Sequence, residues 1–289
     1  MTIQELKRDI LDVYAAHLDA SAKTVAAQKA SHQEKAKRIN ALIAEKQQYL
    51  IEKFARGETT KERQQTLLVI QYCTSVVSLE YRHMVWPYEY MALSRRVGEL
   101  WERFCCAAWD QPSRVGVKRI AAPSFADVAI KLRYRLHEAL ADNTCKNAIA
   151  DIEILFELVG EINMKEDEMF LVDGIPYIID FKSGFGSNEK GNTLRLQTVG
   201  RAYKLWNPNT QLLLLVRQEQ NNNYLNVIKR SGLWDVRCGE KAYATIDELT
   251  GSNIIVLRKE AINFESDLSK TFWSDLSSHL SDLTSYLQW

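Results

Sequence analysis

The stretch "KEDEMFLVDGIPYIIDFK", residues 165–182, carries the strongest prediction of local structure in this chain of 289 residues. Two apolar runs flank the dipeptide Asp173-Gly174. This arrangement predicts a β-hairpin closed by a two-residue type I′ turn, because both central residues of that turn need a positive φ, which Asp and Gly tolerate. The second strand reads as buried, yet it ends on Asp180 and Lys182 and opens into a polar, Gly-rich loop.

The register of the predicted hairpin gathers charged side chains at its open end. A two-residue loop pairs Val172 with Ile175, and counting outward along both strands pairs Asp167 with Asp180. Opposed residues point to the same face, and the alternation of side chains brings Lys182 there as well. Two opposed carboxylates repel each other unless a cation such as Mg²⁺ neutralises them. The strand therefore predicts a rigid platform for a metal ion, beside a loop that can face a substrate.

The same residues also have a simpler explanation. An acid two positions before a lysine occurs again at Glu5 and Lys7 in a predicted helix, and Lys182 can simply neutralise Asp180 at a strand end. The two explanations differ in the effect of removing Asp180. Without metal, a ligand opposed to Asp167 is repelled by it, so its loss leaves stability unchanged or raised, whereas loss of a partner of Lys182 destabilises the fold.

Helices are predicted over most of the first 160 residues. Residues 3–56 contain no Pro or Gly and have widely spaced apolar residues, which predicts a helical hairpin or a short coiled coil. Further helices are predicted from residue 61 to about 82 and over "SRRVGELWERFCCAAWD", residues 94–110. Residues 124–160 also have a mainly helical pattern.

From residue 169 onward, short apolar runs between turn residues predict strands at "MFLV", "IPYIIDF", "QLLLLVR", "YLNVIK" and "NIIVL". A helix is predicted between the second and third runs at "TLRLQTVGRAYKLW", residues 193–206, with Asn192 or Thr193 as its cap. Residues 264–289 have apolar residues at three- and four-residue steps, which predicts one amphipathic helix packed on the core or on a second subunit. The fold class expected is therefore mixed α/β (α+β).

Asp167, a gap of twelve residues, and then Asp180, Phe181 and Lys182 resemble the PD-(D/E)xK nuclease motif, with Glu166 where the family often has proline. The core of that family is a helix, a mixed sheet that contains this hairpin, a further helix and another strand. The resemblance covers roughly residues 93–217, and it is specific in the hairpin and weak elsewhere. It implies a catalytic domain over residues 93–289. Residues 1–92, whose pattern predicts helices, have no counterpart in the family and are expected to serve dimerisation or DNA contact.

The resemblance also implies the composition of an active site. Asp167 and Asp180 would hold Mg²⁺, for which Mn²⁺ can substitute, together with the Phe181 carbonyl and Glu102. Lys182 would orient or deprotonate the attacking water. These residues form the catalytic set of the expected site.

The third acid is less well defined by the sequence. Gly98 and Glu102 are similar to a Gly-x-x-x-Glu pattern in the first core helix of the family, and Glu99 is a competing residue. Whether one or two metal ions bind is open.

The loop and helix after the hairpin are the predicted DNA contact. The loop "SGFGSNEKGNT" is rich in Gly and polar residues, and basic residues exceed acidic ones from residue 182 to residue 204. An ordinary solvated loop and helix face would have the same composition. The residues expected to contact DNA are Ser183, Lys190, Asn192, Arg195, Gln197, Arg201 and Lys204.

Composition narrows the class of protein. Lys+Arg and Asp+Glu number 37 each, so a polyanion must be met by a local basic surface. Five cysteines without CxxC spacing favour reduced thiols and argue against a zinc site. No apolar run approaches the roughly 18 residues that span a bilayer, and no signal-peptide h-region is present, so we expect a protein of the prokaryotic cytoplasm without membrane partners.

These expectations combine into a Mg²⁺-dependent, site-specific endonuclease for double-stranded DNA, most similar to type II restriction enzymes, acting as a homodimer and without a nucleotide cofactor. A structure- or end-directed repair nuclease of the same fold is one alternative. The other is a non-catalytic helical interaction protein that binds nucleic acid. The recognition sequence, the cleavage position and the base-reading residues are not predicted.

Overall fold

The computed structural model describes residues 1–56, 60–139, 150, 152–154, 164, 168–184, 190–219, 223–276 and 286–289. The chain forms two compact units, one of Met1–Val115 with Glu240–Trp289 and one of Gly116–Gly239. This division differs from the expected boundary between residues 92 and 93. The reason is long-range packing, which keeps residues 93–115 and 240–289 with the N-terminal helices.

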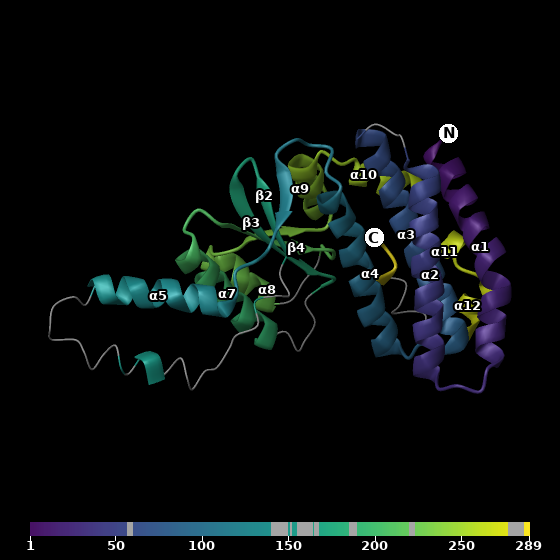
Figure 1. Cartoon of the computed structure of the whole chain (residues 1–289), viewed down its shortest axis with the longest axis horizontal. Coiled ribbons are helices and arrows are strands. Elements are labelled where there is room, and N and C mark those ends of the chain that lie inside the picture. The colour runs from purple at the N-terminus through teal and green to yellow at the C-terminus, as the bar shows by residue number, and fades with distance from the viewer. Residues whose placement is uncertain are drawn as a thin grey trace. The chain divides into compact units, whose positions relative to one another are not determined.

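The first unit is helical and is built from both parts of the chain that flank the second. Its long helices lie side by side, with α3 in contact with α1, α2 and α4 (Figure 1). The segments after residue 240 join them, because α9 contacts α4 and α10 contacts α1 and α3. The helices are α1 (Ile3–Ala27), α2 (His32–Phe54), α3 (Thr60–Val85), α4 (Tyr90–Asp110), α9 (Glu240–Thr250), α10 (Ile254–Ala261), α11 (Phe264–Asp267) and α12 (Lys270–Asp275). The predicted N-terminal helical hairpin is thus confirmed.

A buried polar cluster ties the two parts of this helical unit together. The Lys7 ammonium lies 2.9 Å from a carboxylate oxygen of Asp267, and both side chains are less than a tenth exposed. Lys7 also donates to the carbonyl of Ala261, and the Tyr72 hydroxyl donates to Asp267 over 2.6 Å. Each charge has a partner of opposite sign or a hydrogen-bond partner, as buried charges require.

The second unit contains a mixed five-stranded sheet in the order β1-β2-β3-β4-β5. Strand β2 is antiparallel to both β1 and β3, whereas β3, β4 and β5 run parallel to one another. The elements are β1 (Val117–Ile120), α5 (Phe125–Ala139), β2 (Glu168–Val172), β3 (Ile175–Lys182), α7 (Lys190–Trp206), β4 (Gln211–Val216), α8 (Asn223–Ser231) and β5 (Asp235–Cys238). The mixed α/β class, with a mixed sheet flanked by helices, is therefore confirmed.

The hairpin at residues 168–182 has the predicted turn and register. Asp173 and Gly174 have φ values of 51° and 81°, as a type I′ turn requires. Val172 pairs with Ile175, and the pairing continues in step to Glu168 and Ile179. The next predicted pair includes Asp167, which lies outside the described residues.

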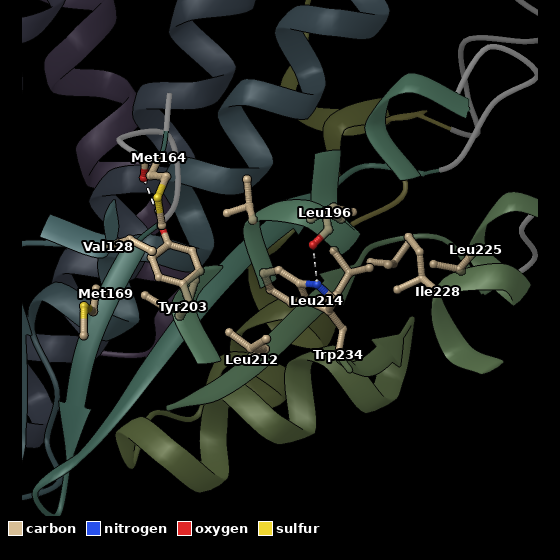
Figure 2. Packing of buried hydrophobic residues seen from close by; sticks show 13 residues of the cluster. Val128, Met164, Met169, Leu196, Tyr203, Leu212, Leu214, Leu225, Ile228 and Trp234 are labelled. Carbon is tan, nitrogen blue, oxygen red and sulfur yellow. Dashed lines mark hydrogen bonds between the residues drawn. The ribbon is translucent and has the colours of Figure 1, made fainter. Parts of the chain in front are cut away.

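One face of the sheet is covered by α5, α7 and α8. Apolar side chains from β2, β3 and β4 meet those of the three helices in one buried cluster, which Figure 2 shows. Two aromatic side chains in this layer satisfy their polar atoms locally: the Tyr203 hydroxyl donates to the carbonyl of Met164, and the Trp234 indole donates to that of Leu196, each over 2.9 Å (Figure 2). This layer fixes α7 over the sheet and so positions the side chains that α7 directs toward β3.

Two predicted strands are helices. The segment "YLNVIK" belongs to α8, where Leu225 and Ile228 are buried three residues apart. The segment "NIIVL" belongs to α10, where Ile254 and Leu257 have the same spacing. In both segments the buried residues follow the helical period, although β-branched residues gave the runs the composition of strands.

The predicted single helix over residues 264–289 is also wrong. The chain forms two short helices, α11 and α12, separated at Leu268 and Ser269. Ser269 caps α12 by accepting a hydrogen bond from the Phe272 amide, which explains the break. No helix in the described residues is long and apolar enough to cross a membrane.

Candidate functional site at the end of strand β3

Asp180 lies near the end of β3 and is only 4% exposed. It alternates with Ile178, so it points to the face of the sheet that α7 covers, and its neighbour on β4 is Leu214. A carboxylate in such apolar surroundings needs charged or hydrogen-bonding partners.

Two cations supply those partners. Lys182, two residues further along β3, bonds Oδ1 of Asp180 through its ammonium group. Arg195 donates from Nη2 to Oδ2 of Asp180 over 2.9 Å. The Lys182 and Arg195 side chains are 22% and 26% exposed, against 3% for Asp180. The described part of this cluster thus holds one negative and two positive charges, and part of each cation reaches solvent.

Arg195 reaches Asp180 because of its place on α7. Leu196, Val199 and Tyr203 form the buried stripe of this helix, and Arg195 lies four residues before Val199 on the border of that stripe. The sequence predicted Arg195 as a DNA contact and missed its pairing with Asp180. The four-residue spacing to Val199 was the signal that could have indicated it.

A third cation, Arg217, lies beside the same strand end and was also missed. Its backbone amide donates to the carbonyl of Lys182 over 2.9 Å, and its Nε donates to the Ser183 hydroxyl over 3.1 Å. Arg217 follows β4 directly, and β4 runs parallel to β3 with Val216 paired to Lys182. That adjacency of parallel strand ends could have placed Arg217 near Lys182, since carboxyl ends of parallel strands lie at one edge of a sheet.

The cluster can offer one carboxylate to a metal ion. Each oxygen of Asp180 bonds one cation, and a carboxylate has about four lone-pair positions, so acceptor capacity is left on both oxygens. Within the described residues, no group of three or more His, Cys, Asp and Glu side chains is placed to hold a metal. Mg²⁺ usually binds proteins through one or two carboxylates and completes its shell with water and substrate phosphate. Asp180 fits that chemistry, and Asp167, its expected partner, lies outside the described residues.

The other predicted DNA contacts lie along α7 and the loop before it. This helix begins at Lys190, so Asn192 and Thr193 lie in its first turn and are not its cap. Asn192 and Arg201 are exposed, whereas Gln197 and Lys204 are half-buried. Lys204 donates to the carbonyl of Pro208 over 3.3 Å. The side chain of Lys190 lies outside the described part of the structure.

The two candidates for a third acid lie on α4. Glu102 is half-buried, and Glu99 bonds Arg96 over 3.1 Å. Both belong to the helical unit, whereas Asp180 belongs to the sheet unit. The site described here therefore consists of Asp180, Lys182, Arg195, Ser183 and Arg217.

Comparison of the chain with models of protein families, with curated proteins and with solved structures found no match in any of the three.

Proposed function

We propose that the protein is a metal-dependent nuclease that hydrolyses phosphodiester bonds of DNA at the end of β3. The observation that carries the proposal is the pairing of a buried carboxylate, Asp180, with Lys182 on one face of a hairpin strand. The register of that hairpin agrees with the prediction at every described pair. Continued by one step, the same register would oppose Asp167 to Asp180.

The proposed roles follow from charge and position. Asp180 and Asp167 would hold Mg²⁺, with the Phe181 carbonyl as a further ligand that the motif implies. When bound, the ion supplies a water of lowered pKa and offsets negative charge on the phosphate. The Lys182 ammonium would orient the attacking water and stabilise the charge that develops on the phosphate oxygens.

The surplus of positive charge favours an anionic substrate. Lys182 and Arg195 flank a single described carboxylate, and Arg217 lies at the adjacent strand end. A phosphate group brought to this edge of the sheet would meet Lys182 and Arg195, which are partly exposed and already held in place by Asp180. Arginine suits that task because its planar donor fork matches phosphate oxygens.

The finer parts of the proposal concern the substrate and the assembly. The polar residues of α7, among them Asn192 and Arg201, would contact the backbone of double-stranded DNA. Site-specific cleavage by a homodimer is proposed because a two-fold protein matches a two-fold DNA site.

A non-catalytic protein that binds nucleic acid is the second candidate. It is favoured by the two cations that already neutralise Asp180 and by the absence of a three-residue metal group within the described ranges. In that function the basic edge of the sheet would bind phosphate without hydrolysing it.

Plasmid cleavage distinguishes these functions. Supercoiled plasmid is incubated with the protein in Mg²⁺, in Mn²⁺ and in excess chelator, and the products are separated and end-sequenced. The test variant is Lys182→Gln, and Lys118→Gln on the exposed part of β1 is the matched control. Discrete metal-dependent bands, lost only in Lys182→Gln, support the proposal. A smear supports the end-directed alternative, and retained DNA binding without cleavage supports the non-catalytic one.

A further inference from the structure

A cavity lies within the helical unit, where α3 ends and α4 begins. Its volume is about 650 Å³, which is in the range of sites for small ligands. Its walls come from α2, the last turn of α3, the link between α3 and α4, and the first turns of α4. The lining includes three arginines, Arg82, Arg95 and Arg96, and two aromatic residues, Trp86 and Tyr88.

Arg82 is held in a fixed orientation by aromatic rings. Its guanidinium carbon lies 4.3 Å from the centre of the Trp86 ring and 5.6 Å from that of Tyr88. Its Nη1 donates to the Trp86 carbonyl over 3.0 Å, and Trp86 itself stacks on His32. Among the described residues this is the one hydrogen bond of the Arg82 guanidinium, so several of its five N–H donors are left for a ligand. A guanidinium ordered in advance loses little entropy when it binds.

Arg96 and Arg95 add positive charge to the same cavity. Arg96 is 19% exposed and Arg95 is 75% exposed, and both contact Glu99, at 3.1 and 3.7 Å. Burial lowers the pKa of Arg82, and the positive charge of Arg96 acts in the same direction. An anion between these two guanidinium groups would remove their repulsion.

The start of α4 is also suited to an anion. The first turn of α4 carries no acidic residue, and the Glu89 side chain makes no capping hydrogen bond. The first amide donors of α4 are therefore left for solvent or ligand. Glu89 and Glu99 also line the cavity. Glu99 partners Arg95 and Arg96, so Arg82 is the lining arginine that has no ion pair among the described residues.

We propose that this cavity binds a nucleoside phosphate, with the phosphate on Arg82 and Arg96 and the nucleoside against the apolar wall. That wall is formed by Pro87, the 41% exposed Trp86 and the 74% exposed Met91. The cavity is much larger than a phosphate ion, and apolar surface beside a few charged groups is the usual lining of a site that holds a small organic ligand. The nucleotide can be free or part of a strand. The inference does not rest on the nuclease function, since none of its residues belongs to the site on β3.

Titration calorimetry in excess chelator tests the inference separately from any cleavage. The probes are thymidine monophosphate, inorganic phosphate, a short 5′-phosphorylated oligothymidylate and a phosphoserine peptide. We expect thymidine monophosphate or the oligonucleotide to bind more tightly than inorganic phosphate. Binding of the mononucleotide assigns the site to free nucleotides, and binding of the oligonucleotide alone assigns it to a strand; both results support the inference.

Variants establish that the binding is at this cavity. Arg82→Gln should weaken binding by about tenfold or more, as loss of a charged hydrogen bond implies. Arg103→Gln, on an exposed part of α4 outside the cavity, is the matched control and should not change binding. If Arg82→Gln does not fold, Arg96→Gln decides, because Arg96 is the second arginine on the phosphate and its lost charge should weaken binding several-fold.

Four results would overturn the inference. The first is that neither nucleotide probe binds. The second and third are that inorganic phosphate, or the phosphoserine peptide, binds as tightly as the nucleotide probes. The fourth is that a folded variant at one of the phosphate-binding arginines keeps the wild-type affinity.

Discussion

Removal of the Asp180 carboxylate is the change for which the structure most clearly predicts whether the protein gains or loses stability. Asp180 is 3% exposed at its side chain and bonds Lys182 through one oxygen and Arg195 through the other. In Asp180→Ala both cations lose their common partner and repel each other across the space that it filled. We therefore expect Asp180→Ala to be less stable than wild type when no metal is present.

The size of the stability loss in Asp180→Ala depends on how deeply the ion pairs of Asp180 are buried. Breaking a fully buried ion pair costs about 3–5 kcal/mol, and an exposed pair contributes about 0–1 kcal/mol. The carboxylate here is buried, but each cation is about a quarter exposed and regains part of its hydration. An intermediate loss of about 2 kcal/mol in the free energy of unfolding is expected.

Urea denaturation in excess chelator measures this loss. Asp235→Ala is the matched control, because Asp235 also pairs with an arginine of the sheet unit, Arg237, at 2.8 Å, but is 55% exposed. Its loss should cost less than about 1 kcal/mol. An Asp180→Ala protein as stable as wild type, or more stable, would refute the cation-paired arrangement and favour opposed carboxylates. Cleavage measured where both proteins are folded then tests the catalytic role by itself.

Three further predictions concern stability. Asp267→Ala should cost about 3–5 kcal/mol in urea denaturation because it leaves the buried Lys7 ammonium without its carboxylate, and Lys7→Met combined with Asp267→Leu should recover most of that loss. Gly174→Ala should cost about 1–2 kcal/mol from the positive φ alone, since no atom lies within 4 Å of the added Cβ; a neutral result would contradict the type I′ turn. Burial lowers the pKa of His83 below 6.5, so the unfolded chain binds the proton more tightly. Stability should therefore be fully present above about pH 6.5 and fall as the pH decreases toward the folded-state pKa, and His83→Gln should lack this component when melts are compared between pH 5 and 8.

The hairpin could be predicted from the sequence because its information is local. Asp173 and Gly174 specify the turn, and a two-residue turn leaves one register, which places Asp180 and Lys182 on one face. The helices α8 and α10 were predicted as strands because their runs are rich in β-branched residues, which are typical of strands. The helical spacing of their apolar residues extends over too few positions to counter that composition. Two buried positions, such as Leu225 and Ile228, are too few to distinguish a helix from a strand.

The partners of Asp180 could be predicted only in part. Lys182 is two residues away on the same strand, so alternation alone places it correctly. Arg195 is brought there by the docking of α7 on the sheet, which depends on the apolar layer around Val199 and Tyr203. The two-unit division has the same cause, since the return of residues 240–289 to the helical unit depends on contacts such as that of Lys7 with Asp267.

The ion pair of Lys7 with Asp267 affects the order in which the two units can fold during translation. Lys7 and Asp267 are 260 residues apart, and the whole sheet unit is made between them. At about 5–20 residues per second, the ribosome needs roughly 13–50 s to supply the second residue after the first. During that time α1, α2 and α3 can form their hairpins, but the Lys7 ammonium has no carboxylate partner. The sheet unit, which is continuous in sequence, can therefore complete its fold first during translation, and the helical unit, although it is begun earlier, closes last.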